Sequence, residues 1–148
     1  MYTDMYSRSF IWILLLVLPF TIQAKPTYQN ITVSDIVSVY DGDTIKVNID
    51  NFPPVIGESI SIRIRGIDAP EIRAKCPLEK TKAIQARDYL RDVLASGEVI
   101  ELHNVERGKY FRLVAYVIVD GKDISQIMLE KQLARPYDGK RKRLSWCE

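Results

Sequence analysis

Five short runs in which apolar and polar residues alternate predict β-strands. They are ITVSDIVSVY (31–40), TIKVNI (44–49), SISIRIRGI (59–67), EVIELHNV (98–105) and YFRLVAYVIV (110–119). The Asp-Gly step between the first two runs is typical of a tight turn, and Pro53, Pro54 and Gly57 predict a loop before the third. We therefore expect a hairpin, a third strand, and two further strands later in the chain.

Two other stretches have helical periodicity. From 77 to 97, PLEKTKAIQARDYLRDVLASG has its apolar residues on one stripe, with Pro77 near the start and Gly97 just past the end. From 123 to 134, DISQIMLEKQLA predicts a helix with Asp123 as N-cap and Gln126 three residues later. This order of elements is that of a small Greek-key barrel. The predicted fold class is α+β and mainly β, a five-stranded barrel of the oligonucleotide/oligosaccharide-binding (OB) type with two to three helices.

The first 24 residues differ in composition from the rest. Their apolar run, FIWILLLVLPF (10–20), is too short to span a bilayer comfortably, and Ala24 is the small residue expected before a signal-peptidase cut. We interpret residues 1–24 as a secretory signal peptide and residues 25–148 as a single domain ending in a basic tail, 138–148. The protein would then be exported to the periplasm or the extracellular space, with only transient membrane contact; the alternative is an uncleaved anchor.

The composition and the missing motifs exclude several classes of catalytic site. The 148 residues are 27% charged and 47% hydrophobic with a net charge of +2, which suits one domain with a real core and is too mild to argue for nucleic acid by itself. A single histidine, His103, excludes sites built on paired histidines, and its place in an alternating strand indicates a structural residue. No G-x-S-x-G elbow or G-x-x-x-x-G-K-[ST] loop is present.

The sequence contains two cysteines, Cys76 and Cys147. An even count in an exported chain favours a disulfide between them, and two free thiols are the alternative. Zinc is not indicated, because the sequence has no CxxC or Cys/His cluster.

The remaining candidates for chemistry are carboxylates and arginines. Arg63 and Arg65 share one face of the third strand, which is followed by Asp68 and Glu71 on either side of Ala69-Pro70. Pairing of the first three strands would bring Asp43, in the DGDT turn, to the same end as Asp68. Oxygen ligands suit calcium or magnesium, and a guanidinium matches two phosphate oxygens, so a phosphodiester is the natural substrate.

Each of these signals also has a simpler interpretation. Asp-Gly-Asp-Thr is commonly only a turn, and Asp-x-Pro-Glu is compatible with a strand exit and helix start. Arginines on an outward strand face are usually solvated, which applies to Arg112 as well. The combination of all of them is harder to explain without a phosphodiesterase site.

The segments VYDGDTIKV, IRIRGIDAPE, KYFRLVAYV and LEKQLARPY, in this order, resemble the successive signature segments of the staphylococcal nuclease-like (thermonuclease) family. The resemblance extends from about Ile36 to Tyr137. It implies a five-stranded barrel with helices and a calcium-dependent endonuclease that hydrolyses DNA and RNA with little sequence specificity. It further suggests 3′-phosphate products and a monomer.

Carried over by position, the resemblance assigns Asp43 and Asp68 as calcium ligands, together with the backbone carbonyl of Ala69. Glu71 would be the general base or would position the attacking water. Asp41 would lie near the metal, in its outer shell. Ala69 stands where the family often has threonine, but the implied ligand is a carbonyl, so little is lost.

The resemblance also assigns the substrate contacts. Arg63 and Arg112 would bind the phosphate, and Lys109 and Tyr110 would lie beside the nucleotide. Phe111 stands where a glycine is common and Gly108 replaces an acidic residue, so the approach to Arg112 departs from the family pattern.

Two alternatives remain open from the sequence. One is a non-catalytic barrel that binds nucleic acid or oligosaccharide, and the other is a secreted calcium-stabilised interaction domain, which would need the acids but not both arginines. The KRKR run from Lys140 to Arg143 is either a solvated basic end or a non-specific phosphate contact.

Overall fold

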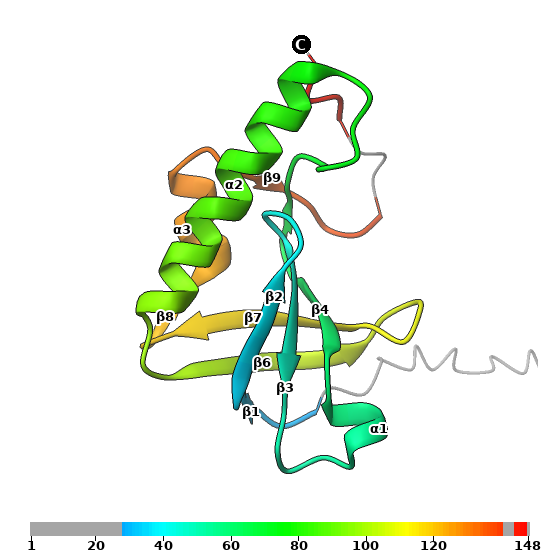
Figure 1. Cartoon of the computed structure of the whole chain (residues 1–148), viewed down its shortest axis with the longest axis vertical. Helices are drawn as coiled ribbons and strands as arrows, with labels where there is room; N and C mark the ends of the chain where they lie inside the picture. The colour runs from blue at the N-terminus through cyan, green and yellow to red at the C-terminus, as the bar shows by residue number, and fades with distance from the viewer. Residues whose placement is uncertain (1–27, 141–143, 148) are drawn as a thin grey trace, which may run out of the picture.

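The computed structural model describes residues 28–140 and 144–147. The proposed signal peptide and three residues of the KRKR run lie outside the described residues. The described chain forms nine strands, most of them in one curled sheet, and three helices (Figure 1). The strands are β1 (Ile31–Thr32), β2 (Asp35–Val39), β3 (Thr44–Asn48), β4 (Ile60–Ile64), β5 (Ile67–Asp68), β6 (Ile100–Arg107), β7 (Leu113–Val119), β8 (Lys122–Asp123) and β9 (Arg135–Pro136). The helices are α1 (Pro54–Gly57), α2 (Pro77–Ser96) and α3 (Ile124–Glu130).

The main sheet has the strand order β1-β6-β7-β4-β3-β2, with β8 beside β7. Its two outer strands, β1 and β2, are consecutive pieces of one chain segment. Between them, the N–H of Val33 donates to Ile100 at 2.9 Å and the N–H of Ser34 donates to Asn48 at 2.9 Å. One bent segment therefore bonds to both ends of the sheet and curls it. Counting that segment once and leaving out the two-residue β8 gives the five strands expected for the OB-type fold, and the order of strands and helices confirms it.

The core lies inside the curled sheet and beneath the helices. Strands β4 and β7 alternate strictly between buried and half-buried residues, so every second side chain points inward. The inward residues are Ile60, Ile62 and Ile64 of β4 and Leu113, Ala115, Val117 and Val119 of β7. Both α2 and α3 contribute to this core, through Leu90 and Met128 among others. The buried stripe of α2 consists of Ala83, Ala86, Leu90 and Leu94. Packing of this stripe in the core fixes the position of α2 and therefore of the end of the loop that precedes it.

Three element boundaries differ from the sequence-based expectation. Helix α3 ends at Glu130 rather than near Ala134, because Gln132 adopts a left-handed φ of 58° and the N–H of Leu133 donates back to Met128 at 3.0 Å. Strand β7 begins at Leu113, because Tyr110 and Phe111 both have φ of 57°, which ends a strand. The loop with Pro53 and Pro54 contains the short helix α1, whose fixed proline φ suits a first helical turn.

The C-terminal residues return to the start of α2. Cys147 forms a disulfide with Cys76, the N-cap of α2, and Trp146 is only 5% exposed. Figure 1 accordingly shows the C-terminus beside the first turn of α2. Among the residues that the structure describes, no helix has the length and apolar character needed to cross a membrane.

Loss of this disulfide should lower the free energy of unfolding without abolishing the fold. The bridge closes a loop across 71 positions, and the entropy it removes from the unfolded chain is typically worth about 2–4 kcal/mol. Urea denaturation of a Cys76→Ser/Cys147→Ser variant, followed by circular dichroism, measures the loss. Reduced wild type should show a similar decrease, and an unchanged midpoint in both would contradict the prediction.

Candidate active site

The turn between β2 and β3 positions two buried acids. The N–H of Asp43 donates to Oδ1 of Asp41 at 3.1 Å, and the N–H of Tyr40 donates to Thr44 at 2.9 Å. The side chain of Asp41 thus closes the turn, and the carboxylate of Asp43 points into the protein, where Asp43 is 0% exposed. Thr44 Oγ1 donates to Oδ1 of Asp43 at 3.0 Å.

Gly42, between the two acids, is required by close packing. A Cβ at this position would lie 2.8 Å from the Cβ of Ala69 and 2.8 Å from the Cβ of Ala86. The turn therefore touches both the exit of β5 and the buried stripe of α2. These two contacts fix the distance of Asp43 from the residues that follow β5.

Arg63 joins the two acids predicted as metal ligands. Register pairing places Thr44 opposite Arg63, so the guanidinium lies beside Asp43. Its Nη1 donates to Oδ1 of Asp43, and its Nη2 donates to Oδ1 of Asp68 at 3.1 Å. The arginine predicted to bind phosphate is thus paired with both acids, and its role toward a substrate stays a prediction.

Asp68 and Ala69 are held from two sides. Strand β5 pairs antiparallel with β9, which sets Asp68 opposite Arg135. The N–H of Ala69 donates to Oδ2 of Asp43 at 2.6 Å. This bond fixes the backbone nitrogen of Ala69 beside the buried acid.

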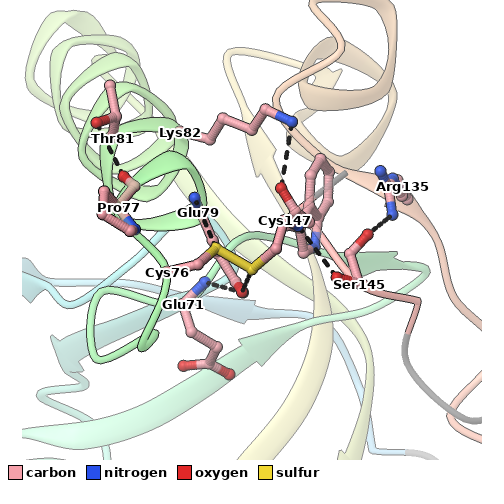
Figure 2. Close-up of a disulfide and its surroundings, with 10 residues drawn as sticks. Glu71, Cys76, Pro77, Glu79, Thr81, Lys82, Arg135, Ser145 and Cys147 are labelled. Atoms are coloured by element: carbon pink, nitrogen blue, oxygen red, sulfur yellow. Dashed lines mark hydrogen bonds between the residues drawn. A yellow bond between two sulfur atoms is a disulfide. The ribbon is translucent and has the colours of Figure 1, made fainter.

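Glu71 follows Pro70 in the loop between β5 and α2. Its N–H donates to Oε1 of Glu79 at 3.1 Å, and its carbonyl accepts from the N–H of Ala74 at 3.0 Å. Figure 2 shows the Glu71 carboxylate directed away from the disulfide, whereas its backbone nitrogen faces Glu79. The loop is therefore held by its backbone, and the carboxylate extends from it.

The buried acids would carry an excess of negative charge if all of them were ionised. Burial raises the pKa of the Asp43 carboxyl to about 8, although the Arg63 guanidinium opposes the shift. Burial also raises the pKa of Asp41 from its usual value, against the N–H bond from Asp43. When Asp41, Asp43 and Asp68 are ionised, one guanidinium leaves two negative charges unbalanced. A divalent cation with a preference for oxygen ligands fits this donor set and charge.

The acids do not form a compact cage in this structure. Within residues 28–140 and 144–147, one group of three candidate donors has its ligand atoms within 4.8 Å of one another, namely Cys76, Glu79 and Cys147. Its two sulfur atoms are bonded to each other, which makes them poor ligands. A cation held by Asp43 and Asp68 therefore needs their side chains, or that of Arg63, to adjust.

Arg112, Lys109 and Tyr110 come from the hairpin that connects β6 and β7. Arg112 directly precedes β7 and lies two residues before Val114, so their side chains point to the same face. Val114 is in turn the register partner of Arg63. Arg112 and Arg63 therefore share the outer face of the sheet. The Nε of Arg112 is buried without a hydrogen-bond partner, so this guanidinium retains capacity for an acceptor such as phosphate.

The tip of this hairpin is aromatic and basic. Tyr110 is 92% exposed, and the Phe111 ring lies 4.1 Å from the guanidinium carbon of Arg107. Left-handed φ values at two consecutive non-glycine residues cost conformational energy, of the order of 1–3 kcal/mol each. Tyr110 is thus held outward at a position where the resemblance expects contact with a nucleotide.

Arg65 and His103 both have partners on neighbouring strand residues. Arg65 pairs with Glu106 at 3.1 Å and donates to the carbonyl of Asn104 at 3.0 Å. His103 Nε2 lies 3.4 Å from Oε2 of Glu101, on β6. Both side chains are thus engaged by residues of β6.

The structure also has a hollow of about 690 Å³ at the opposite end of β3. Acidic, amide and apolar side chains line it, including Asp35, Asp50 and Glu58, and the lining contains no lysine or arginine. An anionic substrate would be repelled there, so the acid and arginine cluster around Asp43 is the better candidate site.

Two residues that contact the candidate site residues were not predicted from the sequence. Glu79 binds the Glu71 backbone, and Arg135 faces Asp68 across β5 and β9. Glu79 follows Cys76 at the spacing of a capping box, which is a signal for a side chain that reaches a backbone N–H before the helix. No local pattern indicates Arg135, because its contact depends on strand pairing across 67 positions.

The close packing of Gly42 gives a test of the site's construction. We expect Gly42→Ala to destabilise the protein by about 1–3 kcal/mol, because the new methyl group has to displace either Ala69 or Ala86. Thermal denaturation measures this loss, and Gly42→Ser should be at least as destabilising. If Gly42→Ala is as stable as wild type, the turn is not fixed by these contacts.

Comparisons with known proteins indicate the family of this chain. A family profile described as "Staphylococcal nuclease homologue" matches residues 61–145. The SPbeta prophage-derived endonuclease YokF of Bacillus subtilis (strain 168) is 34% identical over 97 residues, which cover 64% of this chain and 31% of YokF. Endonuclease YncB of the same organism is 33% identical over 97 residues, covering 64% of this chain and 43% of YncB.

The chain thus spans less than half of the length of these two curated relatives. The family match, in contrast, covers more than half of the chain and includes β4, β5 and the hairpin with Arg112. The chain therefore belongs to the family of staphylococcal nuclease homologues.

Proposed function

We propose that this protein is a calcium-dependent endonuclease that hydrolyses phosphodiester bonds of DNA and RNA with little sequence specificity. The observation that carries the proposal is the cluster of Asp43, Arg63 and Asp68, in which buried acids and a guanidinium meet where β4 and β5 leave the sheet. The endonuclease names of the two relatives and the family match support the same activity.

The cation would be held by Asp43, Asp68 and the backbone carbonyl of Ala69, with Asp41 acting from the outer shell. A bound divalent cation supplies a Lewis acid that polarises a phosphoryl oxygen and neutralises developing charge. Carboxylate and carbonyl oxygens are suited to calcium, and the surplus negative charge of the buried acids favours a dication. The identity of the ion as calcium rests on the family resemblance.

Side chains of the protein would activate the attacking water and bind the phosphate oxygens. Glu71 accepts the proton of the attacking water, or orients that water, from a loop held by its backbone. Arg63 and Arg112 donate hydrogen bonds to the equatorial oxygens, on which negative charge grows during in-line attack. Arg112 has an unpartnered buried Nε that is available for such a bond.

Substrate binding would use the outer face of the sheet and the β6–β7 hairpin. Lys109 and Tyr110 lie at its exposed tip, where a lysine contacts phosphate and a tyrosine ring packs against a sugar or base. Contacts to the backbone of the nucleic acid carry little sequence information, in keeping with broad specificity. Lys140 and the basic run that it begins would add salt-sensitive affinity.

The cellular setting is part of the same proposal. We expect export through the secretory pathway by the segment 1–24, leaving one domain, 25–148, that acts as a monomer. The disulfide between Cys76 and Cys147 supports an oxidising compartment, such as the periplasm or the extracellular space.

The activity is tested by incubating the purified chain with single-stranded DNA, double-stranded DNA and RNA, in calcium, in magnesium or in chelator. Cleavage in calcium that stops in chelator supports the nuclease. Binding without cleavage under every condition would instead identify a non-catalytic binding module.

Glu71→Gln should lower kcat by about 100- to 10,000-fold, because the amide cannot accept the proton of water. The substrate KM should change little, since Glu71 is not assigned to substrate binding. Steady-state kinetics on a fluorescent oligonucleotide measure both constants. Glu98→Gln, an exposed glutamate beyond α2, is the matched control and should retain wild-type kcat. A Glu71→Gln variant within a few-fold of wild type would exclude the base assignment.

Arg112→Lys should also be impaired, by about 100- to 1,000-fold in kcat, although the charge is kept. A planar guanidinium donates two parallel hydrogen bonds to phosphate, and an ammonium group does not reproduce them. The same kinetic assay applies, with Arg91→Lys on the exposed surface of α2 as the control. Full activity of Arg112→Lys would mean that Arg112 acts only as a distant positive charge.

A further inference from the structure

Glu79 connects the loop that carries Glu71 with the disulfide. Its Oε1 accepts the N–H of Glu71 at 3.1 Å, and its Oε2 lies 3.6 Å from Sγ of Cys147 (Figure 2). The sulfur has no proton in a disulfide, so this second approach is a packing contact that limits the rotamers of Glu79. One carboxylate thus meets the Glu71 backbone and the bridged C-terminus at the same time.

The position of Glu79 itself is well determined. It lies in the first turn of α2, and its N–H donates to Sγ of Cys76 at 3.4 Å. Helix α2 is fixed by its buried stripe, including Ala83 and Ala86. A side chain on this rigid turn can hold the backbone of Glu71 in one place, which a solvent-exposed loop could not do by itself.

The same tail also supports the other side of the site. The guanidinium carbon of Arg135 lies 3.9 Å from the centroid of the Trp146 ring, and its Nη1 donates to the carbonyl of Ser145 at 2.8 Å. Lys82 on α2 donates to the carbonyl of Trp146 at 3.3 Å. Since Arg135 pairs with Asp68 across β5 and β9, the tail packs behind a predicted metal ligand as well.

We propose that Glu79 is a positioning residue for Glu71, and that the Cys76–Cys147 disulfide makes this positioning dependent on redox state. This inference rests on the proposed nuclease function. With the bridge closed, the tail packs against Glu79 and Arg135, and the loop holds the Glu71 carboxylate in its working position. With the bridge open, the tail and Trp146 leave, and both supports loosen.

The redox step needs a dithiol as co-reactant. A thiolate of the dithiol attacks the exposed Sγ of Cys147, the S–S bond breaks, and the Cys76 thiolate leaves and takes up a proton. The second thiol of the dithiol then releases Cys147 as a thiol and closes its own disulfide. Two electrons pass to the protein. The nuclease would therefore be weak in a reducing compartment and active after export.

The positioning role is tested with the disulfide intact. We expect Glu79→Ala to lower kcat by about 10- to 100-fold with KM within about twofold, because the catalytic carboxylate is misplaced while substrate contacts remain. Glu79→Gln keeps an oxygen that accepts the Glu71 N–H and should retain kcat within about threefold. Asp92→Ala, an exposed acid on the same helix, is the matched control.

The outcomes of this series separate the possible roles. If Glu79→Ala keeps wild-type kcat, the positioning role is wrong. If Glu79→Gln is as slow as Glu79→Ala, the charge matters rather than the hydrogen bond, and the proposal is also overturned. The number of free thiols is counted in each variant to show that the disulfide is still formed.

The redox dependence is tested on the full chain by reduction with dithiothreitol. Trp146 is one of two tryptophans, the other being Trp12, so the fluorescence of Trp146→Phe supplies the background. We expect the Trp146 emission to shift to the red on reduction and kcat to fall about 10- to 100-fold in parallel, with far-ultraviolet circular dichroism preserved. Reoxidation should restore both signals.

Unchanged kcat after complete reduction would overturn the redox dependence, whether or not Trp146 moves. Loss of the circular dichroism signal in parallel with kcat would overturn it too, because the protein would then be unfolding. Failure of the proposed function is a separate result, since the oxidised wild type would not cleave any nucleic acid. The fluorescence shift is measured without substrate and tests the release of the tail in that case as well.

Discussion

The rest of the site depends on the hydrogen bonds that the buried carboxylate of Asp43 accepts. This carboxylate is fully buried, and it accepts hydrogen bonds from the Arg63 guanidinium, from Thr44 and from the N–H of Ala69. A buried carboxylate without such partners would cost several kcal/mol, so the β2–β3 turn, β4 and the exit of β5 have to meet around it. The backbone adds to this junction, because the N–H of Ile64 donates to the carbonyl of Asp43 at 2.8 Å.

This junction restricts the conformations of the residues around Asp43. Gly42 packs against Ala69 and Ala86 without room for a methyl group, and Arg63 holds two acids at once. Arg112 is half-buried and directly follows the hairpin tip, where Lys109 and Tyr110 are exposed. The proposed nuclease would thus combine a tightly packed ionic cluster with an exposed surface for its substrate.

Much of this arrangement was predictable from the sequence because it is encoded locally. Alternation located the five strands, and the DGDT and DAPE segments indicated acids at one end of the sheet, where the structure does place Asp43 and Asp68. The end of α3 at Glu130 was not predictable, because it depends on a left-handed Gln132, a conformation unusual for glutamine. The start of β7 was missed for the same reason at Tyr110.

The supports of the site could not be read from local pattern because they come from distant segments. Glu79 reaches Glu71 because α2 packs on the sheet, and Arg135 meets Asp68 only after β9 returns to β5. Residues 144–147, the described part of the C-terminus, form no helix or strand of their own. Burial of Trp146 alone would therefore offset only a small part of the conformational entropy that the tail loses on packing. A covalent bond to Cys76 removes much of that entropy. The sequence therefore specifies the reactive groups locally, whereas the disulfide-linked tail helps to keep them in place.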